Sequence, residues 1–433
     1  MLRRLFGLVF VIIVTGAIAS FLNSQGGYTI IEWMGWRIEA RTSLLIAIAG
    51  GFMIIVIGFD RFVGMLIGLP DRISGRIAER RQEQGHHAVA LGLVAASAGD
   101  AREAQRQAKK ATKLMGNSTL TELLSAQAAG LNGDHAAAVT FFEKLSRQRE
   151  TAFFGKAGLM RLHAEEGRTE EALSTGREAL YLNQNTPELA KALMALETRH
   201  QNWDEALAAL KVASRDNAME RDDYANLEAV LHFKKGEAQQ SEDVSSDQVI
   251  KSLEMAHKAD PRFIPAALTL AALYEEHGKA RKINTVLKRS FAACSHPDLA
   301  MALYERWSGG NQQDADALAK LIRLIDKHGN DHACLIAAAR LSMQLSLWGE
   351  ALRLIMIIPA EERNIVAWQV LADLAEHAPE TPQDDWPDRT EALVSAASAK
   401  HPHGWVCQTC QTTHPEWIAL CSSCDGFATM RWQ

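Results

Sequence analysis

A period of 34 residues in the middle of the chain constrains the fold more than any other feature of the sequence. Four segments repeat at this spacing, and each has a turn residue followed five positions later by alanine. The turns are at Gly99, Gly133, Gly167 and Gln201, and the alanines are Ala104, Ala138, Ala172 and Ala206. Glycine tolerates the positive φ of a helix end, and a small side chain lets two helices approach closely. The period therefore predicts stacked pairs of antiparallel helices.

The period is interrupted once and then returns. From Gln201 to Gly278 the separation is two periods plus nine residues, and the polar stretch 234–248 is the predicted insertion. Beyond it the turns fall at Gly278, Gln312 and Ser346, and the packing positions are Ile283, Ala317 and Ala351. Six of the seven packing positions are alanine, so we interpret 71–400 as one repeat array.

This pattern resembles the tetratricopeptide repeat family over roughly residues 85–400. The resemblance implies a right-handed superhelix whose concave groove, lined by the first helix of each repeat, binds extended segments of partner proteins. Arg161 and Tyr274 are candidate groove residues in the first helices of their units. The alternative is an array that only spaces the C-terminal residues from the membrane.

Composition excludes several classes of function. Hydrophobic residues make up 47% and charged residues 23%, which is ordinary for a globular protein and predicts an all-α fold here, because few segments alternate with period two. The net charge of −6 provides no general basic field, so no nucleic-acid partner is expected. We find no phosphate-binding loop, dinucleotide fingerprint or HExxH motif. The sequence therefore predicts a protein that is not an enzyme and has no small-molecule substrate.

The first 70 residues predict a membrane hairpin. Residues 5–22 carry no charge, and a second apolar run covers 43–59, so each is close to the length that spans a bilayer. The loop between them alternates well enough to predict a short β-hairpin. Arginines flank the outer ends of both runs, which places both termini in the cytoplasm by the positive-inside rule. A cleaved signal peptide, with a small-residue site at 17–19, is the alternative.

The C-terminal segment 401–433 predicts a metal module. Four cysteines form two CxxC pairs separated by ten residues: Cys407, Cys410, Cys421 and Cys424. Two such turns can direct four thiolates at one ion, which predicts a structural zinc site in a rubredoxin-like ribbon, with iron as the alternative metal. Two independent redox dithiols also remain open. His401, His403 and His414 are alternative ligands, and the tail's own aromatics are expected to form a miniature core: Trp405, Trp417, Phe427 and Trp432.

The whole layout resembles the HemY family of the proteobacterial inner membrane. The matching positions lie in the predicted hairpin, at Tyr28, Trp36, Ile38 and Glu39. The resemblance implies two spans, a cytoplasmic tetratricopeptide body and an association with haem (porphyrin) biosynthesis. It predicts a multi-pass protein of the bacterial inner membrane that organises protein partners at the cytoplasmic face.

The tetracysteine tail departs from the enterobacterial HemY proteins. It is similar instead to the tail of the lipopolysaccharide-assembly regulator, an anchored tetratricopeptide protein with a rubredoxin-like end. The second hypothesis is therefore a regulatory adaptor in lipopolysaccharide assembly that acts with a membrane protease. Both hypotheses remain open from the sequence.

Overall fold

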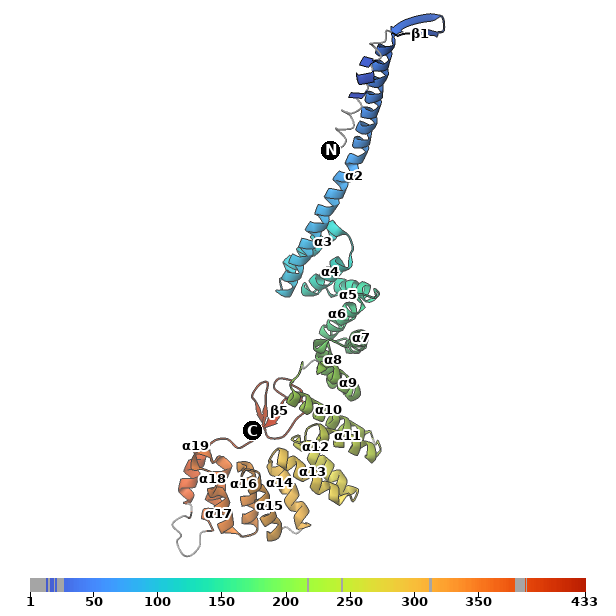
Figure 1. Cartoon of the computed structure of the whole chain (residues 1–433). Helices are drawn as coiled ribbons and strands as arrows, with labels where there is room; N and C mark the ends of the chain where they lie inside the picture. The colour runs from blue at the N-terminus through green and yellow to red at the C-terminus, as the bar shows by residue number, and fades with distance from the viewer. Residues whose placement is uncertain are drawn as a thin grey trace. The chain divides into compact units, whose positions relative to one another are not determined.

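The structure is a computed structural model of the chain (Figure 1). It describes residues 13, 14, 16–18, 20, 21, 27–215, 218–242, 244–310, 314–377, 386 and 388–433, without the side chains of 28, 33 and 60–78. Most of the predicted first span, 5–22, and the predicted turn at Gln312 lie outside the described residues. The chain divides into two compact units, Met1–Phe141 and Phe142–Gln433.

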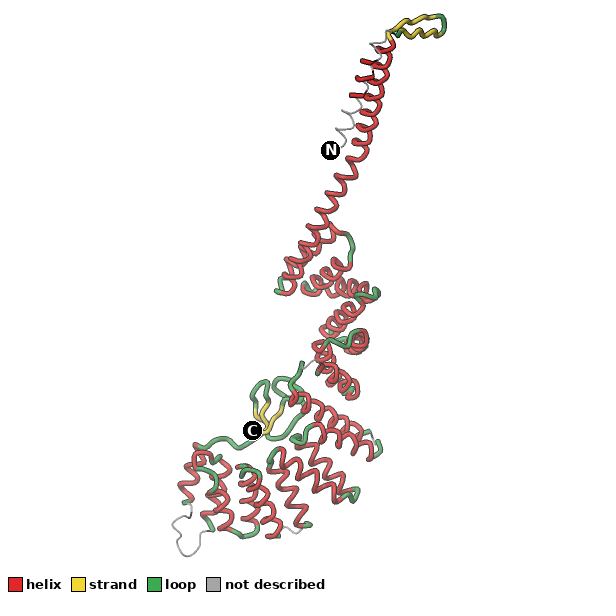
Figure 2. Tube along the Cα trace, viewed as in Figure 1, coloured by secondary structure: helices red, strands yellow, loops and turns green. Residues whose placement is uncertain are grey.

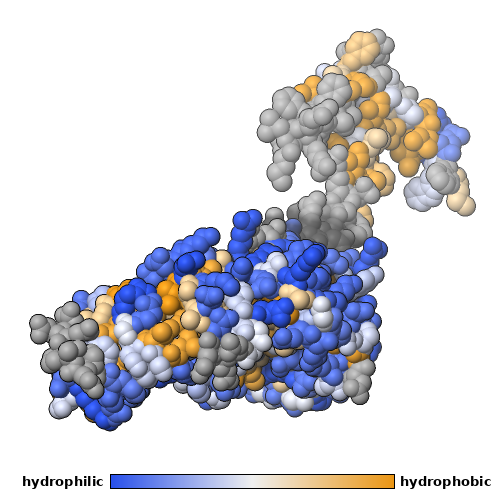
Figure 3. Space-filling model, turned by 90° about the horizontal axis from the view of Figure 1, so that it is seen from below, coloured by the Kyte–Doolittle hydropathy of each residue, from blue (hydrophilic) through white to orange (hydrophobic). Residues whose placement is uncertain are grey.

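The first unit contains the β-hairpin that the sequence predicts. Strands β1 (Tyr28–Trp33) and β2 (Trp36–Arg41) pair antiparallel through a turn at Met34 and Gly35, which both have positive φ. Helix α2 (Thr42–Ser97) follows directly and contains the one candidate membrane span among the described residues, Thr42–Phe59. This window qualifies by its length and composition alone, and Figure 3 shows apolar residues gathered among the described residues of the N-terminal part.

Helix α2 continues far beyond its apolar window. Two shorter helices, α3 (Ala101–Met115) and α4 (Thr119–Leu131), pack on its C-terminal end, where Gly85 lies against Met115. Phe59 and Gly85 are 26 residues apart, which is about 39 Å along a helix. The first packed helices of the unit are therefore separated from the apolar window by a long helical segment.

Paired antiparallel helices make up most of the second unit (Figure 2). The helices from the unit boundary onward are α5 (His135–Ser146, which spans the boundary), α6 (Ala152–Glu165), α7 (Thr169–Leu182), α8 (Pro187–Arg199), α9 (Trp203–Ala213), α10 (Arg221–Ser241), α11 (Ser246–Ala259), α12 (Ile264–Glu276), α13 (Ala280–Ala293), α14 (Pro297–Ser308), α15 (Ala315–Lys327), α16 (His332–Gln344), α17 (Trp348–Met356), the 3-10 turn η2 (Ala360–Glu362), α18 (Ile365–Ala375) and α19 (Arg389–Ser398). The chain ends in β3 (Trp405–Cys407), β4 (Thr413–His414) and β5 (Met430–Trp432).

The repeat positions have the burial and the backbone conformation that the sequence predicts. The packing positions are all buried: Ala104, Ala138, Ala172, Ala206, Ile283, Ala317 and Ala351. The turns that the structure describes all have positive φ: Gly99, Gly133, Gly167, Gln201, Gly278 and Ser346. Gln201 and Ser346 adopt this conformation without glycine, which shows that the helix packing imposes it. The prediction of a mostly helical chain of stacked helix pairs is confirmed.

The extra residues between Gln201 and Gly278 do not form a loop. Instead they lengthen α10, which has 21 residues and runs through most of the polar stretch 234–248. Gly236 lies on α10 opposite Leu253 of α11, where an added Cβ would come within 3.1 Å of that side chain. The longer helix thus keeps the pairing of its unit intact, and the surplus residues extend α10 by about two turns.

Candidate metal centre and its docking surface

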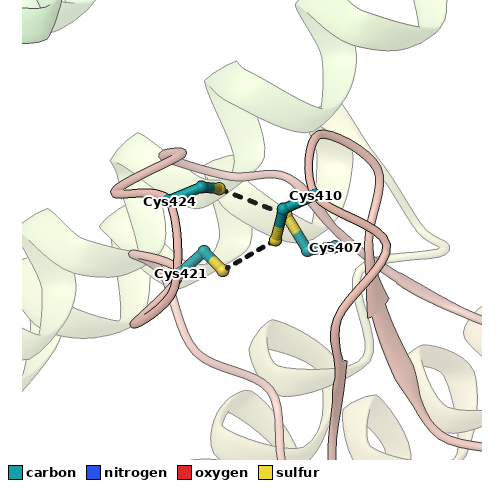
Figure 4. Close-up of side chains that lie close together, drawn as sticks. All are labelled: Cys407, Cys410, Cys421 and Cys424. Atoms are coloured by element: carbon teal, nitrogen blue, oxygen red, sulfur yellow. Dashed lines mark hydrogen bonds between the residues drawn. The ribbon is translucent and has the colours of Figure 1, made fainter.

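The four tail cysteines come together at one point (Figure 4). Both CxxC turns close in the same way, since the amide of Gln411 donates to the carbonyl of Cys407 at 2.8 Å and the amide of Asp425 donates to Cys421 at 2.9 Å. Gln411 and Asp425 have φ of 60° and 55°, so each knuckle contains a left-handed residue although neither is glycine. The knuckle geometry therefore forms here without glycine at these positions.

The sulfur positions fit a single tetrahedral ion. All four Sγ atoms lie within 4.8 Å of one another, and the Cys407–Cys424 and Cys410–Cys421 sulfurs are each 3.6 Å apart. Four sulfurs at about 2.3 Å from one zinc would be separated by about 3.8 Å. Four thiolates fill a tetrahedron and leave no position for a catalytic water, so the arrangement suits a structural ion.

Hydroxyl groups near the sulfurs favour the thiolate form of two ligands. The Thr429 hydroxyl, 3.2 Å from Cys407, and nearby backbone amides lower the pKa of that thiol to about 5. The Thr412 hydroxyl, 3.3 Å from Cys410, likewise lowers the pKa of that thiol. The pKa of Cys424 is raised to about 12, because burial and the neighbouring sulfurs outweigh the amide of Gly426, which lowers it. A cation at the centre would instead favour the thiolate form of Cys424.

The histidines proposed as alternative ligands occupy other positions. Among the described residues, the group that could hold a metal consists of the four cysteines alone. His414 lies beside it, with its Nε2 atom 3.6 Å from the Cys421 sulfur, and could contact a bound thiolate. His403 instead stacks on Trp432, and His401 is exposed.

The tail aromatics pack on the repeats, which corrects the expectation of a self-contained miniature core. The Trp417 ring lies edge-on to Phe233 of α10 at 5.6 Å and to Phe263, just before α12, at 4.9 Å. Phe427 packs against a cluster that includes Leu207 of α9. A tail of about 30 residues buries too little apolar surface to fold alone, and the repeats supply the missing surface.

Polar groups also join the tail to the repeats. Asn226 of α10 is buried and donates its side-chain amide to the carbonyl of Ala428 at 2.7 Å. His296, which precedes α14 and is 1% exposed, lies 4.1 Å from Trp432 between ring centroids and 5.7 Å from Trp405. Cys407, Cys421 and Met430 belong to the same apolar core as α10 to α18. The tail is thus part of the core of the second unit.

The two groove candidates differ in the structure. Arg161 on α6 is exposed and lies 3.9 Å from Glu165, as a partner-binding residue requires. Tyr274 is only 2% exposed and donates its hydroxyl to Glu254 at 2.5 Å, so the prediction that it lines an open groove is wrong. Its ring belongs to the core because the neighbouring helices cover it.

The hairpin and the helices after it match a known family. Residues 27–133 match the family described as HemY protein N-terminus. This confirms the HemY resemblance for that region, which contains the matching positions Tyr28, Trp36, Ile38 and Glu39. The tetracysteine tail lies outside the matched HemY region.

A full-length relative and several solved structures are also similar. The probable magnetosome protein Mms48 of Magnetospirillum gryphiswaldense is 23% identical over 440 residues, covering 100% of this chain and 93% of that protein. The crystal structure of MamA protein is 19% identical with a TM-score of 0.26, over 41% of this chain and 92% of that one. A tetratricopeptide repeat protein from Parabacteroides merdae is 16% identical with a TM-score of 0.29, over 62% and 99% of the two chains. At these TM-scores the structural matches add nothing to the fold given by the helix packing.

The docking surface on the repeats was not predicted from the sequence. Phe233 and Phe263 offered a weak signal, because they are aromatic residues in an array that otherwise packs mainly alanine and leucine. Aromatic residues inside helices are ordinarily core residues of their own unit, so this signal pointed to no particular contact. Only the folded chain brings them to Trp417.

Proposed function

We propose that this chain is a membrane-anchored, non-catalytic scaffold that holds protein partners at the cytoplasmic face of the bacterial inner membrane. The regular stack of helix pairs supports this function, because such arrays present extended surfaces rather than enclosed reaction sites. Apolar runs at 5–22 and 43–59 would form the two spans, with both termini in the cytoplasm. The helical segment from Phe59 to Gly85 would hold the repeats away from the bilayer.

Haem (porphyrin) biosynthesis is the process that we propose the scaffold serves, on the strength of the HemY match over residues 27–133. The tetracysteine tail favours the second candidate, an adaptor in lipopolysaccharide assembly that acts with a membrane protease, because the tail lies outside that match. Mms48 is named as a probable magnetosome protein, so recovery of magnetosome proteins is a further outcome of the crosslinking experiment described below.

Zinc is the metal that we propose for Cys407, Cys410, Cys421 and Cys424, with iron as the alternative, since both accept four thiolates. The ion would stabilise the tail and would take no part in a reaction. Elemental analysis of the purified full chain tests this proposal. One zinc per chain is expected, iron would replace zinc in the proposal, and no metal would reject it.

Crosslinking of the intact protein in its native membrane, followed by purification, tests the scaffold. Arg161→Glu reverses a charge on α6, which is the first helix of its repeat. Lys211→Glu is the matched control, because Lys211 is exposed on α9, which is the second helix of its repeat. Arg161→Glu is expected to weaken partner binding by about 2 kcal/mol, so that fewer late haem-biosynthesis enzymes are recovered. Lys211→Glu is expected to leave their recovery unchanged. Recovery of a membrane protease would decide for the lipopolysaccharide adaptor.

The spacer alternative predicts a different outcome. Charge reversal on α6 would then be silent, and only a change in the length of the array would matter. Deletion of 134–201, which removes two periods, would abolish partner recovery in that case while Arg161→Glu left it unchanged. Such a result would contradict the groove function. A reporter fused after Gln433 that is active only in the periplasm would contradict the cytoplasmic orientation.

A further inference from the structure

A groove lies where the docked tail meets three repeats of the second unit. Its volume is about 420 Å³, and its apolar lining comes from the helices α14, α16 and α18 and from the tail. Met301, Leu341 and Val366 are the helix contributions, and Trp432 and His403 are those of the tail. The tail thus forms one wall of a cavity whose other walls are helices of the repeats.

The groove continues into a larger cavity. This second cavity has a volume of about 900 Å³ and shares Met301, Leu341 and Gln344 with the first. Because they share these lining residues, the two cavities adjoin each other along successive repeats. An extended polypeptide matches this shape, because its side chains can occupy the two cavities in sequence.

The charges along the groove differ at its two ends. Arg340 and His403 are the titratable residues that line the smaller cavity, and none of the described residues around it is a carboxylate. Arg340 is exposed and makes no ion pair with any residue that the structure describes. Glu305 in the larger cavity is also exposed, while its neighbour Arg306 lies 3.7 Å from Glu275. The smaller cavity is therefore complementary to an acidic group.

The wall that the tail supplies depends on the cysteine cluster. Trp432 is held against His296 and Trp405, and strands β3 and β5 pair Trp405 with Trp432 and Cys407 with Met430. Cys407 therefore lies two residues after Trp405, which pairs with Trp432. A tail that loses its cluster geometry would also lose this wall of the groove.

We propose that the groove binds an extended peptide segment of a partner protein, with apolar side chains over Met301 and Leu341 and a carboxylate at Arg340. The proposal rests on the scaffold function and adds the chemistry of the bound segment. Because Trp432 completes the groove, binding requires the docked tail as well as the repeats.

Fluorescence polarisation with the full chain in lipid nanodiscs tests the proposal. The probes are labelled ten-residue peptides in which Leu and Phe alternate with Asp and Glu, and a matched set in which Lys replaces the acids. The acidic set is expected to bind and the lysine set to bind at least tenfold more weakly. Arg340→Glu is expected to reverse this preference, whereas Arg323→Glu on the exposed part of α15 should leave it unchanged.

Cys424→Ser tests the contribution of the tail. The change is expected to weaken binding of the acidic peptides at least tenfold, with hydrogen exchange rising in the tail and not in α6 and α7. Absence of binding by either set up to millimolar peptide would overturn the proposal, as would equal binding of the two sets to the unmodified chain or a preference unaffected by Arg340→Glu. If crosslinking still recovers partners in that case, the groove assignment fails and the scaffold stands. If the peptides bind and crosslinking recovers no partner, the scaffold fails instead.

Discussion

The repeats before and after the start of α10 are stabilised in different ways. From α6 to α9 the described core residues form small clusters between neighbouring helices, such as Met160 with Leu173 and Leu193. From α10 to α18 one continuous core extends through successive repeats and includes residues of the tail. Repeat arrays usually depend on contacts between neighbours alone. The second region adds contacts between residues about 200 positions apart, as between Asn226 and Ala428, so its stability depends on the tail.

Metal removal tests this dependence on the tail and should have the largest effect on stability. Chelation, or Cys421→Ser, should undock the tail and expose the aromatic surface around Phe233 and Phe263, because structural zinc supplies about 10–16 kcal/mol to such small modules. Hydrogen exchange should rise throughout the tail, along the inner surface of α10 to α14 and in α9 where Phe427 packs, with little change in α6 and α7.

The control for metal removal is Cys294→Ser, which changes a cysteine outside the cluster and should retain the metal. A rise in exchange as large in α6 and α7 as in α10 to α18 after chelation would contradict the idea that the tail stabilises mainly the second region.

Loss of the central aromatic contact should have the next largest effect. Trp417→Ala removes the ring that packs against both Phe233 and Phe263, and such truncations cost about 3–5 kcal/mol. Chemical denaturation should show this loss in the transition that includes α10 to α18, while elemental analysis still finds the metal. Tyr181→Ala on α7, where the side chain is 83% exposed, is the matched change in the other region and should stay within about 0.5 kcal/mol.

A smaller effect is expected from the buried amide. Asn226→Ala leaves the carbonyl of Ala428 without its donor in a buried site, which costs about 1–3 kcal/mol. The exposed Asn185, before α8, provides the comparison, and its change to alanine should shift stability by no more than about 0.5 kcal/mol. Equal losses for the two variants in thermal unfolding would show that the contact between Asn226 and the tail contributes nothing specific.

The last effect concerns pH, and it is small for each pH unit. Burial lowers the pKa of His296 to about 4, with Asp298 and Asp331 opposing this shift and His403 adding to it. The unfolded chain therefore binds the proton more readily than the folded chain between about pH 4 and 6.5. Stability should fall as the pH drops through this window, by at most about 1.4 kcal/mol per pH unit from this residue.

His296→Asn should reduce that pH dependence, because asparagine can keep the hydrogen bond to the amide of Asp298 and does not titrate. His257, whose pKa burial also lowers to about 4, contributes in the same direction and remains in the variant. An unchanged slope of unfolding free energy against pH would exclude His296 as the titrating group.

The sequence by itself determined the local and periodic features. Ala104 and its equivalents are buried because a 34-residue helix pair brings that position to the closest approach in every unit. The hairpin at 28–41, the apolar window of α2 and the convergence of four cysteines likewise follow from short-range spacing. Each of these features needs only residues that are near one another in the chain.

Only the tertiary structure decided how the distant parts combine. No pattern near Trp417 indicates that its neighbours are Phe233 and Phe263, because the contact depends on the path of the intervening repeats. The structure also decided that neighbouring helices cover Tyr274 and that the surplus after Gln201 lengthens α10. Periodicity fixes which face of a helix is apolar, whereas the packing of distant segments decides what covers that face.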